Sequence, residues 1–533
     1  MPIVQSGSLN TTALVVPDLY VQVVPPQNLV VNGVPTNVVG VVGTASWGPV
    51  NQPVIVGSMA DYARSFGPLQ ARTFDMGTPV GTAVQQGAQA FRCVRVTDGT
   101  DTAASYAMFY NQGGAAGGYP MLLTARYSGS LGNSVAIQLV PGSAAGTWRL
   151  SIGLPGQLAE SFDNVAAPTT AAFWGNLVRA VNQGQGPLRG PSQLCVATLG
   201  SATGTAPAVL IPQTLLNGSD GVGGVAASTV VGVDGLPRTG MYALRGQGCS
   251  LLVLSDVSDA TTWTVQAGFA LQEGCYVILT GPVGDGIPAA VAAKQGAGLD
   301  SYSAKLMFGD WVYWSDPVGG TVRLVSPQGF VAGRLANLSP EQSSLNKPLY
   351  GVVGTQRAGV PGSGGTTGYS TAELTALLGA GLDVIANPQP GGAFWGVRGG
   401  HNSSSNVGTN GDNYTRLTNF IAATLAGGMG QYVGQVINAG LFRRIRSTQL
   451  SFLQGLLGQG MLGSTSGALP FSVVCDASNN PLSRTGLGYV QSDAQIQYQA
   501  INERFIVNLE GGQTVQVTRQ TLPSGQVGVG VVN

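Results

Sequence analysis

Nucleophilic catalysis in this chain would depend on one residue, because His401 is the only histidine. A Ser-His-Asp or Cys-His apparatus needs an imidazole as its general base. His401 lies in the string GGHNSSSNVGTNGDN, whose glycines, serines and asparagines predict a loop, and no G-x-S-x-G motif accompanies it. We therefore expect a solvated loop histidine, and we predict no catalytic residue and no enzyme.

The cysteines do not predict metal chemistry. They are five in number, widely separated and set in apolar strings such as CVRV and CYVIL, at Cys93, Cys195, Cys249, Cys275 and Cys475. With one histidine and no C-x-x-C pair, the spacing of a zinc site is missing from the sequence. The pattern predicts buried free thiols in a reducing compartment, and no metal site.

Nucleotide binding is not predicted either. The three lysines, Lys294, Lys305 and Lys347, do not follow glycines in the P-loop pattern. Residues 458–463 match G-x-G-x-x-G, but they follow a predicted helix instead of joining a strand to a helix. This glycine run indicates a helix stop, so we predict no cofactor.

Three arginines form the one basic cluster that we select as a candidate contact site. Arg443, Arg444 and Arg446 crowd the first turn of a helix predicted over 441–457, against the preference set by the helix dipole. The cluster is too small for a nucleic-acid footprint, since it lacks aromatic partners and further basic residues. We interpret it either as a solvated helix end or as a contact for an acidic protein surface.

The composition describes a large globular chain with few charges. Its 533 residues predict roughly three or four domains. Lys+Arg and Asp+Glu both number 24, so the formal net charge is +0 and no global field attracts nucleic acid or an anionic membrane. A chain that is 44% hydrophobic but only 9% charged suits a subunit buried against copies of itself. A glycine-rich monomer fits nearly as well.

Neither a secretory signal nor a membrane span is predicted. The N-terminal string MPIVQSGSLNTT has no basic start and no apolar run. The nearest approach to a span is 421–442, but Gln431, Gln435 and Asn438 lie inside it. We expect a buried or interface helix there, and no membrane insertion.

Both ends of the chain predict short strands beside a break. Residues 19–24 alternate before Pro25-Pro26, and the valines beyond 514 alternate behind Gly511-Gly512. A strand needs partners for its backbone groups, so we expect these arms to pair with a sheet elsewhere. The residues predicted to form inter-subunit arm strands are Tyr20, Val21, Val23, Val515, Val517, Val527, Val529 and Val531.

The pattern between the arms changes three times. Strand and helix patterns near 38–96 indicate a βαβ-like unit, and short alternating runs separated by glycine-rich turns indicate an inserted β domain. Alternating strands and helices after 230 then predict a parallel α/β sheet. The predicted segments are an N-terminal arm (1–25), a first core segment (26–102), an inserted β domain (103–228), an α/β domain (229–390), a C-terminal core domain (391–510) and a C-terminal arm (511–533).

The strings PDLYVQVVPPQNL, YSGSLGN and LNGSDG, among others, resemble motifs of one family, the contractile tail sheath proteins of bacteriophages and related injection machines. The stretch PDLYVQVVPPQNLVVNGVPTNVVGVVGTASWGPVNQPVIVGSMADYARSFG is similar to the family's opening in the order of its landmarks. YSGSLGN (127–133) and LNGSDG (216–221) are similar to its Gly-x-x-Gly-Asn and Gly-Gly-x-Asp-Gly motifs. Later strings also resemble family motifs, namely PQGFVAGRLA, GAGLDVIANPQPGGAFWGVRG and FLQGLLGQGMLG.

The resemblance implies a multidomain α/β and β fold. A discontinuous α+β core would carry donor-strand arms, an inserted mostly-β domain and a subtilisin-like α/β domain without catalytic residues. It also implies a function: a structural subunit that polymerises helically around an inner tail tube and contracts to drive the tube through the bacterial envelope. In the family, both arms are donated to sheets of neighbouring subunits.

Partners and location follow from the same resemblance. They would be identical subunits, the inner tail tube protein, and the baseplate and tail terminator proteins, in a virion tail assembled in the bacterial host cytoplasm. The arginines at 443, 444 and 446 become candidates for contact with the tube. Two alternatives stay open: a hydrolase on the subtilisin-like segment, and another virion structural protein of the tube or capsid.

Overall fold

A computed structural model describes residues 3–4, 21–22, 33–109, 118–360, 368–509, 511 and 513. The chain forms two compact units, Met1–Gln499 and Ala500–Asn533. All the helices and sheets described below belong to the first unit.

The first unit is built on a six-stranded sheet with the order β15-β14-β13-β3-β5-β4. Its strands are β3 (Val38–Gly43), β4 (Pro53–Val56), β5 (Ala90–Arg95), β13 (Leu251–Leu254), β14 (Tyr276–Thr280) and β15 (Ala304–Met307). All neighbours are parallel except β4, which is antiparallel to β5. The five parallel strands have the flavodoxin-like order of a doubly wound sheet. The predicted parallel sheet is confirmed, and it combines strands from 26–102 and 229–390.

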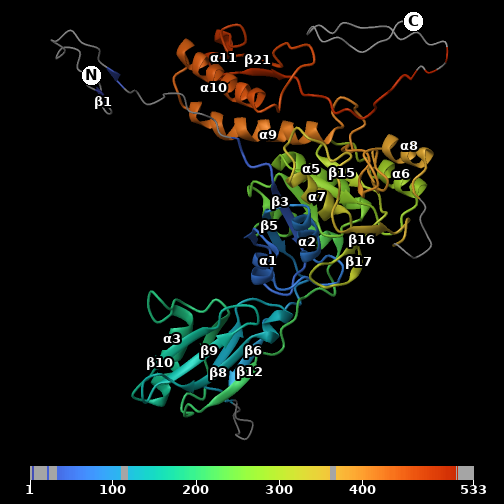
Figure 1. Ribbon diagram of the computed structural model, residues 1–533. Helices are drawn as coiled ribbons and strands as arrows, with labels where there is room; N and C mark the ends of the chain where they lie inside the picture. The colour runs from blue at the N-terminus through green and yellow to red at the C-terminus, as the bar shows by residue number, and fades with distance from the viewer. Residues whose placement is uncertain are drawn as a thin grey trace, which may run out of the picture. The chain divides into compact units, whose positions relative to one another are not determined.

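Helices cover both faces of this sheet (Figure 1). Alternate strand residues point to opposite faces, so Val41 and Val253 enter one apolar cluster while Val42 and Leu254 enter the other. The first cluster is covered by α1 (Met59–Phe66), α2 (Gly77–Gln85) and α7 (Gln328–Ala336). The second is covered by α4 (Ala227–Val231), α5 (Trp263–Glu273), α6 (Ile287–Gly296) and α8 (Thr371–Gly379).

The two strands on either side of the turn at 47–49 differ in burial. β3 is buried along its length. β4 lies at the edge of the sheet, and the side chain of Ile55 is 70% exposed. Its short length and its first residue, Pro53, suit an edge strand, because proline cannot donate to a ladder.

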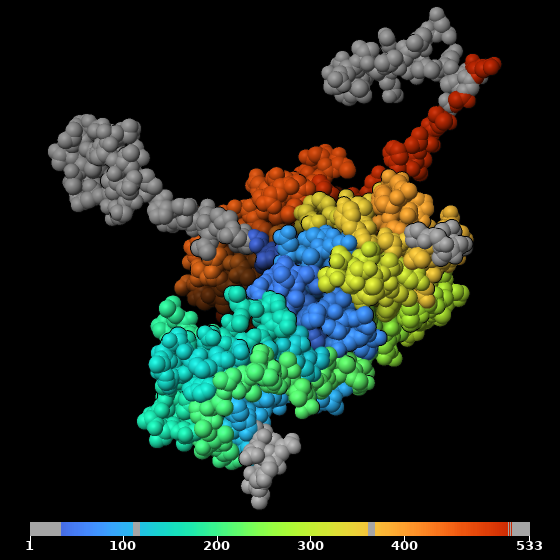
Figure 2. Space-filling model, turned by 60° about the horizontal axis from the view of Figure 1, so that its bottom comes forward, coloured from blue at the N-terminus to red at the C-terminus, as the bar shows by residue number. Residues whose placement is uncertain are grey.

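The segment between 105 and 214 is mostly β, as predicted. One sheet has the order β10-β9-β8-β12 and a second the order β11-β7-β6. In the space-filling view of Figure 2 this segment, cyan to green, forms a closely packed body. The strands are β6 (Ser105–Met108), β7 (Met121–Ala125), β8 (Ala136–Pro141), β9 (Trp148–Gly153), β10 (Glu160–Val165), β11 (Cys195–Leu199) and β12 (Leu210–Thr214).

One helix in this segment was not predicted. α3 (Thr170–Gln183) begins at Thr169, whose hydroxyl accepts the N–H of Ala172. Phe173 and Trp174 of α3 enter the same apolar cluster as the inward residues of the two sheets. The helix therefore completes the core of the inserted β domain.

Small antiparallel sheets surround the central one. One contains β16 (Val312–Ser315), β17 (Val322–Val325) and β18 (Val352–Thr355), and another pairs β19 (Ile385–Ala386) with β20 (Gly396–Val397). Two backbone hydrogen bonds add further chain to the outer edge of β15. The N–H of Asp383 donates to Leu306 O at 2.9 Å, and the N–H of Ser403 donates to Ala304 O at 2.8 Å. This outer edge of the main sheet is therefore protected by the chain itself.

The C-terminal part of the first unit pairs two helices with a hairpin. α9 (Asp412–Met429) and α10 (Ala439–Gly458) pack side by side, with the rings of Phe420 and Phe452 6.1 Å apart (Figure 1). The hairpin consists of β21 (Phe471–Val474) and β22 (Asp493–Ile496), and the loop between them carries α11 (Leu482–Thr485).

The expectation of one buried or interface helix over 421–442 is wrong, because this stretch is not a single helix. α9 ends at Met429 and α10 starts at Ala439, and Val433 between them is 85% exposed. The glycine-rich string lets the chain turn there. Among the described residues, every helix is too short or too polar to span a bilayer.

Candidate functional site

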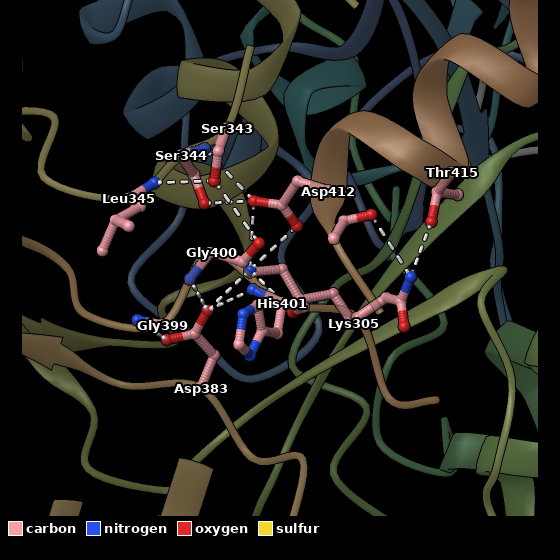
Figure 3. Close-up of polar contacts among 12 residues, drawn as sticks. Lys305, Ser343, Ser344, Leu345, Asp383, Gly399, Gly400, His401, Asp412 and Thr415 are labelled. Carbon is pink, nitrogen blue, oxygen red and sulfur yellow. Dashed lines mark hydrogen bonds and ion pairs between the residues drawn. The ribbon is translucent and has the colours of Figure 1, made fainter. Parts of the chain in front are cut away.

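His401 lies beside a buried ion network (Figure 3). Its carbonyl accepts the Lys305 Nζ–H at 2.9 Å, and its N–H donates to Asp383 Oδ2 at 3.3 Å. The residue is half-buried, and its backbone forms an antiparallel β-bridge with Gly411. His401 is therefore held in place through its backbone, and its half-buried side chain is not a fully solvated one.

The centre of this network is Lys305 on β15. Its Nζ lies 2.7 Å from Asp383 Oδ2 and 3.0 Å from Asp412 Oδ1. All three side chains are almost fully buried, at 0%, 2% and 0% exposure for Lys305, Asp383 and Asp412. Asp412 is the first residue of α9, so the ion network ties that helix to the central sheet.

Hydrogen bonds satisfy the remaining oxygens of the two carboxylates. The Tyr276 hydroxyl donates to Asp412 Oδ1 at 2.7 Å, and the Ser344 hydroxyl donates to Asp412 Oδ2. Asp383 accepts the backbone N–H groups of Gly399 and Gly400 at 2.8 and 2.7 Å. Paired in this way, both charges can be kept in a low-dielectric interior.

The pKa values reflect this arrangement. Burial alone would lower the pKa of Lys305, but the charges of Asp383 and Asp412 outweigh it and hold that pKa above its ordinary value. Burial likewise opposes ionisation of Asp412, yet Lys305 and the hydroxyl donors hold the pKa of that carboxyl below its usual range. Lys305 and Asp412 therefore form a charged pair in the interior, where solvent does not reach them.

A second place to look for chemistry is the carboxyl edge between β3 and β13. In flavodoxin-like sheets, ligands bind in the crevice where the strand order reverses. Here the 72–76 loop enters that position, because Thr44 N donates to Phe74 O at 2.7 Å and Phe74 N donates to Asp256 Oδ2 at 3.2 Å. A Cβ on Gly43 would lie 2.6 Å from Phe74 O. The chain itself thus occupies this position.

The cysteines are free, as predicted. Four are buried and Cys249 is half-buried. Burial raises the pKa of the Cys195 thiol to about 12, and it raises the pKa of Cys93 further. Such thiols stay protonated and are weak metal ligands and nucleophiles.

The arginine cluster lies on the exposed side of α10, in its second turn and not in the first as predicted, because the helix starts at Ala439. Arg443, Arg444 and Arg446 are exposed, and among the residues that the structure describes no ion pair involves them. Arg444 Nη2 donates to Gln435 Oε1 at 2.8 Å. A groove of about 690 Å³ follows one stripe of the helix, lined by Arg443, Arg446, Ser447, Leu450, Ser451, Gln454 and Gly455.

Two predictions about α10 are confirmed. The helix covers the predicted range, and it begins at Asn438, whose side chain accepts the N–H of Leu441. It ends at Gly458, and Gly460 beyond it has a φ of 76°. The glycine run there is a helix stop, and not a dinucleotide loop.

Most of the predicted arm residues lie outside the described part of the chain. Val21 lies in β2 (Val21–Gln22), which pairs in parallel with β1 (Ile3–Val4) in register Ile3↔Val21. The residues outside the described part are Tyr20, Val23, Val515, Val517, Val527, Val529 and Val531. Pairing of the arms between subunits therefore stays a prediction.

Sequence reasoning missed an apolar string that precedes the predicted C-terminal arm. In the second unit Phe505, Val507 and Leu509 are 81%, 69% and 90% exposed. Their spacing of two residues in NERFIVNLE was the available signal, although Ile506 between them is also 81% exposed, and among the described residues the string has no ladder partner. Exposed apolar residues spaced in this way indicate a segment that binds another surface.

Comparison with known proteins places this architecture in the class of contractile-tail sheath folds. No family model matches the sequence, and no curated protein matches it. A sheath tail protein from Desulfitobacterium hafniense matches with a TM-score of 0.57 at 15% identity, over 85% of this chain and 92% of that chain.

Two further solved structures agree. A sheath tail protein from Listeria innocua matches with a TM-score of 0.59 at 13% identity, over 84% of this chain and 90% of that one. The sheath of an extracellular contractile injection system, PVC, in its contracted state, matches with a TM-score of 0.53 at 12% identity, over 93% and 98%. The chain thus has the multidomain α/β fold of sheath proteins, as its motifs predict.

Proposed function

We propose that this protein is the structural subunit of a contractile sheath. It polymerises helically around an inner tube and shortens to drive that tube through a bacterial envelope. The observation that carries the proposal is the fold, which matches sheath proteins over 84% or more of this chain and 90% or more of theirs. Partial matches to one common domain would not support a shared assembly role.

A structural role suits the chemistry of the chain better than an enzymatic one. The ion network around Lys305 is buried, and its carboxylates are committed to fixed partners. The 72–76 loop occupies the position where related sheets bind ligands. These features favour a non-enzymatic subunit over a hydrolase on the segment for which a subtilisin-like topology was predicted.

The hairpin β21–β22 is our candidate acceptor for the arms of neighbouring subunits. It is a sheet of only two strands, and among the described residues each strand has one edge without a ladder partner. Phe471 and Val473 are buried in the cluster beneath it, so one face is already anchored. Two-stranded sheets are marginal alone and are completed by added strands.

The donors would be 1–25 and the C-terminal segment of other subunits. That segment includes the exposed string at 505–509 as well as the arm predicted beyond 511. At about 1 kcal/mol net per hydrogen bond, a five-residue strand contributes a few kcal/mol per junction. Repeated along a helical lattice, such junctions keep subunits linked while their bodies change packing.

The remaining partners follow from the same role. They are the inner tube, for which Arg443, Arg444 and Arg446 are the candidate contacts, and the baseplate and terminator proteins at the two ends of a tail. The location would be a virion tail or a related injection machine, assembled in the host cytoplasm. No P-loop is present in the sequence, so the work of shortening would come from contact energy that differs between two lattices.

Deleting residues 500–533 tests the proposal. The truncated chain should stay soluble and folded, with a near-ultraviolet circular dichroism spectrum like that of the full chain, but it should form no tubes in negative-stain microscopy. The double variant Phe505→Asp with Val507→Asp should weaken tube formation without removing any residue. Leu188→Ser, at a fully exposed position of the inserted domain, is the matched control and should polymerise normally. Tubes formed equally well by the truncated chain would refute the role assigned to the arms.

A further inference from the structure

Two motifs of the inserted domain meet where that domain joins the central sheet. They are YSGSLGN at 127–133 and LNGSDG at 216–221. Asn133 Nδ2 donates to Gly218 O at 2.9 Å, and Gly218 N donates to Asn133 Oδ1 at 2.8 Å. A Cβ on Gly218 would lie 2.4 Å from Gly129 O, so the two backbones are in direct contact. The motifs therefore form one continuous surface.

Arg95, the last residue of β5, enters this surface from the sheet. Its side chain is fully buried. Nη1 donates to Gly48 O at 2.9 Å and to Ser128 O at 2.7 Å, and Nη2 donates to Asp220 O at 3.3 Å. One guanidinium thus joins the loop after β3 to both motifs of the inserted domain.

Asp220 makes a second contact between the inserted domain and the part of the chain around the central sheet. Its Oδ2 forms an ion pair with Nη1 of Arg72, which lies in the loop between α1 and α2. Its Oδ1 accepts the N–H of Ser130 at 2.6 Å. The side chain of Asp220 is only 10% exposed, so solvent screens this pair weakly. This carboxylate, itself part of the 216–221 motif, therefore contacts the 127–133 motif and the body, meaning the part of the first unit built on the central sheet.

A third contact comes from a part of the chain that belongs to neither of the two segments connecting the inserted domain to the rest of the first unit. Those segments run side by side, with a bridge between Thr102 and Ser219. Trp47, from the loop after β3, is buried in the apolar cluster of the inserted domain, where its ring lies 5.4 Å from that of Tyr127. Leu131 N donates to Ser46 O at 3.1 Å.

Two adjacent connecting segments alone would form a hinge, since domains joined in this way usually move relative to each other. We infer that a clasp made by Arg95, Arg72 and Trp47 of the body with 127–133 and 216–221 fixes the inserted domain rigidly to the central sheet. Arg95 is its positioning residue, because it contacts three separate segments at once. The inference concerns a single chain and does not rest on polymerisation.

Single-molecule energy transfer between two dyes measures this rigidity. The dyes are attached through non-natural amino acids at 158, in the inserted domain, and at 318, in the β16–β17 hairpin, where Leu158 and Val318 are 95% and 65% exposed. The full-length chain is held at nanomolar concentration, so that it stays monomeric. We expect one narrow distribution of transfer efficiency for the unaltered chain.

Arg95→Met and Asp220→Asn should both broaden that distribution. Asp220→Asn keeps the shape of the side chain and an oxygen for the Ser130 N–H, so it tests the clasp if Arg95→Met does not fold. Hydrogen exchange of β8 and β9 should stay slow in both variants, which separates loss of orientation from unfolding. Arg179→Met, on the exposed side of α3, is the matched control and should keep the narrow distribution. A broad distribution in the unaltered chain, or an unchanged narrow one in every folded clasp variant, would overturn the inference.

Discussion

Lys305 is a cation that compensates two buried carboxylates. Its contribution to stability is the cost that would arise if both carboxylates stayed buried without it. Asp383 and Asp412 belong to segments far along the chain from β15, at separations of 78 and 107 residues. The ion network therefore connects the sheet, the 383–401 segment and the first turn of α9. A buried charge left without its partner costs far more than a surface ion pair contributes.

Replacing Lys305 by Met should destabilise the protein by about 3–5 kcal/mol, because two carboxylates would remain buried without a cation. Urea unfolding followed by tryptophan fluorescence measures the loss. Lys347→Met is the control, and we expect a change within about 0.5 kcal/mol there, because Lys347 lies outside the network. The double variant Lys305→Met with Asp412→Asn should recover part of the loss, since one uncompensated charge is removed. A loss below about 1 kcal/mol in the single variant would contradict this account of the network.

Asp75 should make stability depend on pH in the opposite sense to a salt-bridged carboxylate. Burial raises the pKa of Asp75 to about 7, against the opposing charge of Arg72. In the unfolded chain the same carboxyl loses its proton near pH ~4, so between about pH 4 and 7 the native state binds more protons. Stability therefore falls as pH rises through that window, and Asp256, with a pKa raised by burial to about 6, adds a smaller fall.

Asp75→Asn should remove most of this slope. Because one pKa unit corresponds to about 1.4 kcal/mol, the variant should be more stable than the unaltered protein at alkaline pH, by up to about 4 kcal/mol. Near pH ~4, where the native Asp75 is already neutral, the two should agree. Thermal unfolding across this range checks the prediction, and parallel pH profiles for the two proteins would contradict it.

Local signals allowed several elements to be predicted from the sequence. Ser58 accepts the N–H of Asp61 at the start of α1, and Ser370 and Glu373 form a capping box at the start of α8. Caps and glycine stops depend on residues within one turn, so the sequence displays them directly. The buried strands of the parallel sheet were predictable for a similar reason, since they are continuous apolar runs.

Elements that depend on distant contacts could not be predicted in the same way. The string PVIV of β4 looks like a buried strand, and only the strand order shows that it is an edge. The partners of Lys305 are more than 70 residues away, so a lysine within the apolar strand AKLM could have indicated a buried charge, but it could not have indicated its carboxylates. The break between α9 and α10 was missed because an uncharged helical pattern continues through its glycines.

At the scale of the whole molecule, the proposed shortening of the sheath needs two features, and contacts among the described residues favour both. The body should move as a unit, and the clasp at Arg95 and the ion network at Lys305 both oppose internal motion. The links between subunits should survive a change of packing, and an edge-to-edge strand pairing can do so because its hydrogen bonds are made within the added strand and its acceptor. Energy would then be stored in the contacts between bodies, and between sheath and tube.

Contact with the tube gives the last prediction. The chain has a formal net charge of +0, so three exposed arginines on one helix are a local excess of positive charge suited to an acidic tube surface. The triple variant Arg443→Glu, Arg444→Glu and Arg446→Glu should still form sheath polymers, because the arms are intact, but it should leave purified tubes uncovered in co-assembly followed by electron microscopy. Reversing the exposed Arg149 and Arg179 of the inserted domain to Glu is the control and should not prevent tube covering. Because exposed charges are screened by salt, co-assembly of the unaltered protein should also weaken as ionic strength rises. Normal covering of tubes by the triple variant would remove these arginines from the contact.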